Sequence, residues 1–248
     1  IDNTASHAIP LVIAADDFVV QRNVRGKPLS TILAGYPWFA DWGRDTFIAL
    51  PGLLLCTGRY DQARDVLHAY ALAIKDGLVP NRFDDYDDDA AHYNTVDASL
   101  WFLHAALEYL QHRADPDAWN DWLRDAALQI TDAYIAGTRH GIALAGDGLI
   151  IAGDPHTQLT WMDAAAHAPD GTFTVFTPRF GKAVEINALW HHALLGLADR
   201  LQQDRPDKAD HLTKLAARAK RAFARSFWDD DLGHLHDHIK PAPPGKPG

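Results

Sequence analysis

Residues 96–110, VDASLWFLHAALEYL in one-letter code, carry the pattern that decides the fold. Apolar side chains recur there at steps of four and three residues, namely at Val96, Leu100, Leu103, Leu107 and Leu110. Residues at this spacing share one face of an α-helix. The stretch therefore predicts an amphipathic helix of about four turns that packs its apolar face into a core.

Similar apolar stripes recur along the chain, and they predict seven helices near residues 6–22, 44–56, 59–75, 95–113, 116–137, 182–203 and 207–228. Pro51 should kink or interrupt the second of these helices. The only strands we expect are 142–145 and 149–152, joined as a short hairpin by a Gly-Asp-Gly turn. Long connections follow the third and fifth helices, whereas short ones precede the third, fifth and seventh. This layout is typical of stacked helical hairpins, so the sequence predicts an all-α fold.

Composition excludes several classes of partner. The 248 residues include 23 basic and 33 acidic side chains, a formal net charge of -10, which repels phosphate backbones and anionic membranes. We therefore expect a neutral substrate, no nucleic acid and no membrane. The only cysteine, Cys56, follows an apolar run and is expected to be a buried spectator without a disulfide partner. With no apolar stretch near the ~20 residues of a membrane span and no secretory signal, a cytoplasmic protein is expected.

Both ends of the sequence look cut or processed, since it starts at Ile1 and stops in a Pro/Gly-rich segment. We expect one domain over residues 1–240. Residues 241–248 offer almost no core-forming side chain and should form a tail.

Three stretches that should be loops, 38–46, 77–101 and 160–190, crowd aromatic rings, carboxylates, arginines and amides together. A sugar presents hydroxyls in every direction and an apolar ring face. A sugar pocket therefore needs planar donors, carboxylate acceptors and indole rings at once. The residues that supply this inventory are Trp38, Trp42, Arg44, Asp45, Asn81, Arg82, Tyr93, Asn94, Asp97, Trp101, Trp161, Asp163, Arg179 and Glu185.

Two other clusters have side chains that metals prefer. The acidic run 84–89 (DDYDDD) lacks the glycine and the terminal Glu of an EF-hand loop, so a solvated loop is the favoured interpretation. His234, His236 and His238 alternate, yet no fourth ligand accompanies them. We expect neither a metal nor another cofactor.

Five longer motifs carry a family resemblance: residues 35–47 (GYPWFADWGRDTF), 77–83 (GLVPNRF), 93–101 (YNTVDASLW), 160–164 (TWMDA) and 177–190 (TPRFGKAVEINALW). They resemble, in the same order, the amylo-α-1,6-glucosidase catalytic domain of glycogen debranching enzymes. The resemblance implies an (α/α)6 toroid of twelve helices, the six-hairpin glycosidase type, with the active site in loops at one end. The seven expected helices would form an incomplete barrel with a small β-hairpin.

Glycosidic cleavage needs one protonated carboxyl for the leaving oxygen and one carboxylate that activates water or attacks. The resemblance implies that Asp163 is the general acid, and apolar neighbours would raise its pKa. Without the resemblance, the favoured interpretation of Asp163 is a turn residue before the alanines at 164–166.

The same resemblance implies that Arg44 and Asp45 clamp hydroxyls of the glucosyl unit, with Trp42 or Trp38 as a wall. Asp45 could otherwise be a first-turn carboxylate that the helix dipole favours. Asp97 should lie in the first turn of the helix at 95–113, whereas Tyr93 and Asn94 beside it match a family loop, so the resemblance implies that Asp97 binds substrate or supports a residue that does.

A later group has a structural alternative as well. Arg179, Lys182 and Glu185 could form a weak surface cluster at a helix N-terminus, whereas the resemblance implies that they border the pocket, with Glu185 contacting substrate or orienting the acid. Trp161 is expected to stack on sugar because it lies in a loop, while Trp101 and Trp190 should belong to the core. The full set expected to bind substrate is Trp38, Trp42, Arg44, Asp45, Asn81, Arg82, Tyr93, Asn94, Asp97, Trp161, Arg179, Lys182 and Glu185.

The resemblance implies a catalytic base that is a Glu beyond the seventh helix. The only glutamates here, Glu108 and Glu185, lie in segments unlike that late motif. Two hypotheses remain: an inverting glucosidase that removes α-1,6-linked glucose from branched α-glucans such as glycogen, with its base outside this sequence, or a non-catalytic carbohydrate-binding fragment. An open barrel exposes apolar faces, so an oligomer that closes the gap is also possible. A sugar lyase or epimerase is disfavoured, because no motif supplies a positioned His or Tyr base.

Overall fold

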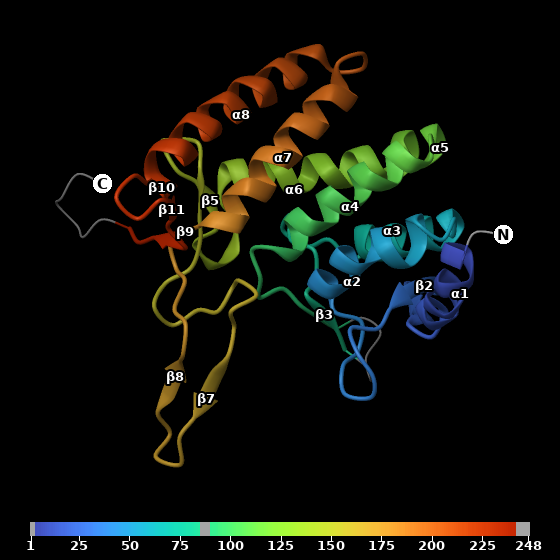
Figure 1. Cartoon of the computed structure of the whole chain (residues 1–248). Helices are drawn as coiled ribbons and strands as arrows, with labels where there is room; N and C mark the ends of the chain where they lie inside the picture. Colours follow the sequence, from blue (N-terminus) through green and yellow to red (C-terminus); the bar gives the residue numbers. More distant parts are fainter. Residues whose placement is uncertain (1–2, 85–89, 242–248) are drawn as a thin grey trace. The chain divides into compact units, whose positions relative to one another are not determined.

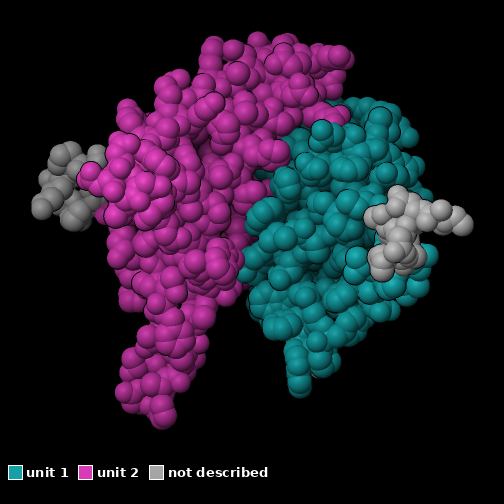
Figure 2. Space-filling view, viewed as in Figure 1, with its two compact units in different colours: residues 1–93, 101–128 teal, residues 94–100, 129–248 magenta. Residues whose placement is uncertain are grey.

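The computed structural model describes residues 3–84 and 90–241, and the chain divides into two compact units (Figure 2). Unit 1 comprises residues 1–93 and 101–128, and unit 2 comprises residues 94–100 and 129–248. Of the tail expected at 241–248, all residues but the first lie outside the described part of the chain.

Helices carry most of the described chain (Figure 1). They are α1 (Asn3–Asp16), α2 (Gly43–Leu50), α3 (Tyr60–Leu72), α4 (Ala98–His112), the continuous run of α5 (Pro116–Ala118), a π-helical turn (Trp119–Leu123) and α6 (Arg124–Ala136), and then α7 (Val184–Leu201) and α8 (Pro206–Phe227). All the expected helices except the first are confirmed to within a few residues. Asp115 caps the start of α5, because its carboxylate accepts a hydrogen bond of 2.9 Å from the Ala118 N–H.

Pro51 interrupts the second helix as expected. The α-helical hydrogen-bond pattern stops at Leu50, and a π-helical turn follows over Pro51–Leu55. Proline has no N–H to donate, so one α-helical hydrogen bond is lost at this point. The turn that follows has the π-helical pattern, in which an N–H donates to the carbonyl five residues earlier, as the Cys56 N–H does to the Pro51 carbonyl. The expectation that Cys56 is buried is wrong: Leu54 and Leu55 face the core, and the cysteine is exposed at the end of this turn.

The helix expected at 6–22 is wrong over its second half. Helix α1 ends at Asp16, and an antiparallel hairpin follows, formed by β1 (Val19–Val24) and β2 (Lys27–Ile32). The turn between them places Arg25 and Gly26 at positive φ, the conformation that two-residue hairpins need. The buried Val24 and Leu29 of this hairpin pack against α3.

The hairpin expected at 142–152 is confirmed as β5 (Ala143–Leu144) and β6 (Ile150–Ile151). The expectation that it is the only one is wrong. The other antiparallel pairs are β3 (Arg82–Phe83) with β4 (Ala91–His92), β7 (Ala165–His167) with β8 (Phe173–Val175), β9 (Lys182–Ala183) with β12 (His238–Ile239), and β10 (Trp228–Asp229) with β11 (His234–Leu235). Strands of two or three residues are too short to show an alternating pattern in sequence.

Each unit has its own aromatic core. In unit 1 the Phe47 ring lies edge-on to Tyr70 and Phe102, with ring centres 4.7 and 5.4 Å away. In unit 2 helices α7 and α8 lie side by side (Figure 1), and buried Trp190 stacks on Tyr134 with ring centres 6.1 Å apart. The expectation that Trp190 belongs to the core is confirmed.

The acidic run and the absence of a membrane span can be checked only for the described residues. Within the acidic run, Asp84 is described, and residues 85–89 lie outside the described part of the chain. Among the helices of residues 3–84 and 90–241, none combines the length and the apolar character that crossing a membrane requires.

Candidate functional site

The residues expected to bind substrate fall into two groups, one in each unit. Unit 1 holds Trp38, Trp42, Arg44, Asp45, Asn81, Arg82 and Tyr93, and unit 2 holds Asn94, Asp97, Trp161, Asp163, Arg179, Lys182 and Glu185.

The unit 1 group is built around the start of α2. The Gly43 N–H donates a hydrogen bond of 2.8 Å to the Asn81 carbonyl, and the Asn81 side-chain oxygen lies 3.5 Å from the Arg44 nitrogen. A Cβ atom at position 43 would overlap the Pro80 carbonyl oxygen, so only glycine allows this close approach. The result is a helix N-terminus with buried Arg44 and, in the first turn as expected, an exposed Asp45.

An arginine and an indole lie next to this turn. Trp42 and Arg82 form a short antiparallel bridge, and the Arg82 guanidinium lies over the Trp42 ring at 5.9 Å from its centre. A cation over the face of an indole is attracted by the ring's negative face. Arg82 also contacts His92, with 2.9 Å between Nη2 and Nε2. Trp42 is thereby held half-buried, whereas Trp38 is 84% exposed.

Asp41, two residues before α2, carries a buried carboxylate that the sequence analysis did not single out. Asp41 is 1% exposed, and its two oxygens accept hydrogen bonds of 2.7 and 2.8 Å from Arg22. Thr31 donates to the same carboxylate at 3.1 Å, and the Tyr70 hydroxyl donates to the Asp41 carbonyl at 3.3 Å. Burial, followed by the charge of Asp41, raises the pKa of Tyr70 far above its usual value, so the hydroxyl stays a donor. No local signal in the sequence pairs Arg22 with Asp41, because the hairpin that brings them together is not evident from the sequence.

The loop before α4 contributes one residue to unit 1 and two to unit 2. Tyr93 uses its hydroxyl to donate a 2.7 Å hydrogen bond to the Ala73 carbonyl. Asn94 is exposed, and Asp97 is 1% exposed directly before α4 rather than within its first turn. In unit 2 the Val96 N–H donates to the Leu159 carbonyl at 2.9 Å, which fixes this loop beside the segment that carries Asp163.

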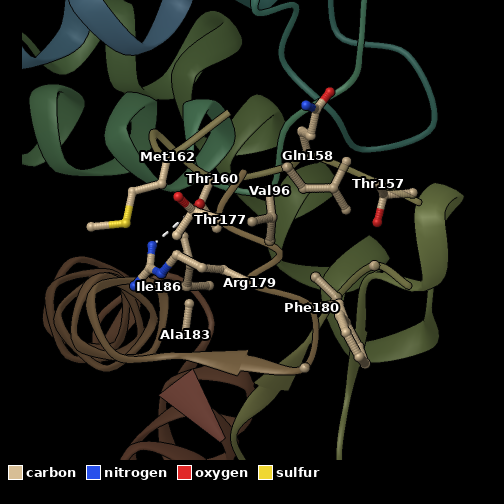
Figure 3. Close-up of a pocket in the computed structure, with 14 residues that line it drawn as sticks. Val96, Thr157, Gln158, Thr160, Met162, Thr177, Arg179, Phe180, Ala183 and Ile186 are labelled. Atoms are coloured by element: carbon tan, nitrogen blue, oxygen red, sulfur yellow. Dashed lines mark hydrogen bonds between the residues drawn. The ribbon is translucent and has the colours of Figure 1, made fainter. Parts of the chain in front are cut away.

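In unit 2, side chains of the segment Thr160-Trp-Met-Asp163 alternate in direction. Thr160 and Met162 line a cavity of about 10 Å³, with Arg179 also in its wall (Figure 3). Trp161 is 56% exposed, and Asp163 is exposed as well. A cavity of that volume accommodates about one water molecule and no sugar. The segment therefore buries one pair of side chains and presents the indole and the carboxylate to solvent.

Arg179 anchors this segment. Its side chain is 2% exposed, and it donates to both oxygens of Glu185 at 2.5 and 2.6 Å and to both oxygens of Asp237 at 2.8 and 2.9 Å. The Nη1 atom also donates to the Thr160 hydroxyl at 3.2 Å, the contact drawn in Figure 3. Burial alone would lower the pKa of Arg179, but the hydrogen bonds to the two carboxylates outweigh it and raise the pKa.

This geometry corrects the interpretation of Arg179, Lys182 and Glu185 as a weak surface cluster. Glu185 lies in the first turn of α7 as expected, but its partner is almost fully buried, which makes their interaction stronger than that of an exposed pair. Lys182 lies in β9 and pairs instead with Asp147 in the β5–β6 turn, at 2.7 Å. Asp237, the second carboxylate on Arg179, was missed because it lies 58 residues further along the chain in no recognisable motif.

The histidines considered for metal binding make other contacts. His236 lies 3.2 Å from Asp229, and His238 lies 3.4 Å from Asp237. Across residues 3–84 and 90–241, no cluster of three or more His, Cys, Asp or Glu side chains has a geometry that could hold a metal ion.

Comparison with known proteins first defines a class. A rhamnosidase from Klebsiella oxytoca, solved with rhamnose bound, superposes with a TM-score of 0.55 at 18% identity, over 78% of this chain and 34% of that one. The fold is therefore that of the six-hairpin glycosidases, all-α with small two-stranded sheets.

Sequence similarity identifies the family. The profile of the amylo-alpha-1,6-glucosidase family matches residues 13–246, so this chain belongs to that family. The glycogen debranching enzyme of Saccharomyces cerevisiae is 30% identical over 68% of this chain. The chain spans 14% of the length of that enzyme.

Proposed function

We propose that this chain contributes the α-1,6-glucosidase chemistry of a debranching reaction, in which glucose joined through an α-1,6 bond is released from a branched α-glucan such as glycogen. Membership of the amylo-alpha-1,6-glucosidase family supports the reaction class. The similarity to a yeast enzyme named for glycogen debranching supports the substrate. The net charge of -10 agrees with a neutral polysaccharide, and the single cysteine agrees with a cytoplasmic setting.

The observation that carries this proposal is the alternation of the 160–163 segment on its Arg179 anchor. Thr160 is held by Arg179, and Asp163 three residues later is exposed to solvent. A general acid must reach the glycosidic oxygen, so an exposed carboxylate on a fixed backbone meets the geometric requirement. We assign to Asp163 the transfer of a proton to the leaving oxygen. Trp161, exposed beside it, is assigned to the apolar face of the glucosyl ring.

Arg179 is assigned a positioning role. A guanidinium has five N–H donors, and protein acceptors on Thr160, Glu185 and Asp237 engage all five. Glu185 is 26% exposed and keeps a face open to solvent, so it remains a candidate for a sugar hydroxyl.

In unit 1 the proposed contacts to sugar hydroxyls are made by exposed or half-exposed polar groups. Asp45 offers an exposed carboxylate, and Arg82 offers guanidinium donors beside the Trp42 ring. We propose that buried Arg44 and Asn81 support this turn from within. Trp38, Tyr93, Asn94 and Lys182 remain proposed substrate contacts because they lie in family motifs. Asp97 is 1% exposed, so we propose that it supports its loop from within.

The second carboxylate of the reaction is proposed to lie outside this sequence. Glu185 is committed to Arg179, and Glu108 lies within α4, so neither is assigned as the base. The inverting course implied by the family resemblance needs a base that activates water on the opposite face of the sugar.

Glucose release from a limit dextrin with single α-1,6-glucosyl stubs tests the proposal. The polypeptide that carries this chain together with the second carboxylate is assayed as the wild type, as Asp163→Asn and as Asp210→Asn, a control on the exposed face of α8. We expect release that falls at least about 100-fold in D163N and is unchanged in D210N, since a general acid contributes on the order of 10²–10⁴. Equal rates in D163N and the wild type would refute the assignment. A folded protein that binds glucan without releasing glucose would instead support the carbohydrate-binding alternative.

A further inference from the structure

The hairpin of β7 and β8 begins two residues after Asp163 and stands apart from the body of unit 2 (Figures 1 and 2). Its strands pair with each other, Ala165 opposite Val175 and His167 opposite Phe173. The Phe176 N–H extends the pairing by donating a hydrogen bond of 3.2 Å to the Ala164 carbonyl. We call residues 164–176 the arm.

The arm is held together by its own hydrogen bonds, although it buries little. At its tip the Ala168 N–H donates to the Thr172 carbonyl at 2.8 Å, and the Asp170 side chain accepts from the Thr172 N–H at 2.9 Å. The hydrogen bond from the Thr172 N–H first, and then that from the Thr172 side chain, lower the pKa of Asp170. Apart from the half-buried pair Ala165 and Val175, its residues are exposed. An isolated two-stranded hairpin is only marginally stable in water. Binding of a ligand to its exposed side chains would stabilise the arm.

The side chains of the arm are unusual for an exposed surface. Phe173 is 43% exposed and Phe176 is 62% exposed, while the His167 ring lies 4.7 Å from that of Phe173. Successive residues of a strand point to opposite faces, so Phe173 and Phe176 present one aromatic ring on each face. Asp170 is the only carboxylate between residues 164 and 176, and no lysine or arginine occurs there. Aromatic rings, threonine hydroxyls and near-neutral charge suit a ligand that is itself neutral and carries apolar ring faces among hydroxyls.

We infer that the arm binds the α-glucan chain that carries the branch point, the glucosyl units on the leaving-group side of the bond that Asp163 helps to cleave. This inference rests on the proposed function, since it takes the arm's ligand to be the same polysaccharide. Continuity along the backbone supports it: Trp161, 56% exposed, and Asp163 lead directly into the arm, so a glucan chain that extends from the acid meets Phe173 and Phe176 next. The arm then selects long chains over short ones, whereas cleavage depends on Asp163.

Binding of maltoheptaose to the whole chain, measured by titration calorimetry, tests the arm. The double variant F173A/F176A is compared with the wild type and with Trp228→Ala, which removes an indole that is 49% exposed elsewhere in unit 2. We expect the dissociation constant to rise at least about tenfold in F173A/F176A and to stay within about twofold in W228A. Because both phenylalanines are exposed, circular dichroism and thermal unfolding should match the wild type.

Three results separate the arm from the proposed function. Unchanged maltoheptaose binding in a folded F173A/F176A chain would overturn the inference and leave the assignment of Asp163 intact. The D163N variant should bind maltoheptaose as the wild type does, while failing to release glucose from the limit dextrin. Loss of maltoheptaose binding in D163N would count against a separate role for the arm. If the wild type is a dimer that F173A/F176A converts to a monomer, by sedimentation, the arm is an interface between copies and the inference is wrong.

Discussion

At the scale of single residues, two arginines organise the two groups of candidate residues, one in each unit. Arg22 with Asp41 fixes the turn before α2 in unit 1, and Arg179 with Glu185 and Asp237 fixes the Asp163 segment in unit 2. In both, a planar guanidinium meets carboxylates through paired hydrogen bonds, which sets direction as well as attraction.

This arrangement predicts that Arg179→Lys is strongly destabilising. An ammonium cannot replace paired bonds to two carboxylates and a hydroxyl, so we expect the free energy of unfolding to fall by about 2 to 4 kcal/mol. Glucose release should fall as well, because the Asp163 segment loses its anchor. Urea unfolding measures the first effect. Arg113→Lys, in an exposed pair with Asp61, is the matched control and should leave stability unchanged. Equal stability of the two variants would contradict the role given to Arg179.

Candidate residues within motifs can be predicted from sequence, but their partners cannot. Asp163, Arg179 and Glu185 stand out because they lie in long stretches with a family resemblance. Asp237 lies outside these stretches. Asp41 lies inside the stretch 35–47, but the stretch does not reveal its partner, because the arginines that bind Asp41 and Asp237 are 19 and 58 residues away. Pairing over such distances depends on packing, which a local pattern does not record.

At the scale of elements, Gly43 fixes how α2 starts. A side chain there would overlap the Pro80 carbonyl oxygen, and the Tyr70 ring is only 3.4 Å from the same point. We predict that Gly43→Ala lowers the free energy of unfolding by about 1 to 3 kcal/mol, as overpacking in a dense region does.

Gly52 provides the control for this prediction. It lies just beyond α2, and a Cβ atom there would have no neighbour within 4 Å. Gly52→Ala should therefore be neutral or stabilise the fold by up to about 1 kcal/mol, because alanine restricts the unfolded chain. The comparison uses urea unfolding of both variants. If G43A is as stable as G52A, the close approach to Pro80 does not constrain the turn.

Helices are predictable here because their apolar stripes run over three or more turns, as in α4 and α8. Short strands are not. The sequence predicts the end of a helix where the β1–β2 hairpin lies, since the Arg25-Gly26 turn lacks the usual Asn-Gly signal. The arm escapes prediction for a related reason: three-residue strands, one of them rich in alanine, give no distinctive period.

At the scale of the whole molecule, the class of fold follows from sequence and is supported by a structural neighbour with only 18% sequence identity. What sequence does not indicate is the division into two units. Two of the three boundaries lie inside α4 and α6, and the third lies between residues 93 and 94, in the loop before α4. Continuous helices leave no change in composition to mark such a boundary.

The net charge leads to a prediction about salt. A chain of charge -10 should bind a neutral glucan through stacking and hydrogen bonds, without displacing counterions. We expect the dissociation constant for maltoheptaose to change less than about twofold between about 0.05 M and 0.5 M sodium chloride. Calorimetry at both salt concentrations makes the measurement. Affinity for maltoheptaose that falls steeply with salt would contradict binding through stacking and hydrogen bonds alone.

The hydrogen bonds of Arg179 also limit when this part of the chain can fold during synthesis. Its last partner, Asp237, is 58 residues further along the chain. At a synthesis rate of about 5–20 residues per second, Asp237 is added roughly 3 to 12 s after Arg179. Until then the guanidinium lacks one of its two carboxylates, so the segment that carries Asp163 cannot reach its final arrangement. A nascent chain on the ribosome therefore gains a complete anchor only once synthesis has reached β12, the strand that pairs with β9.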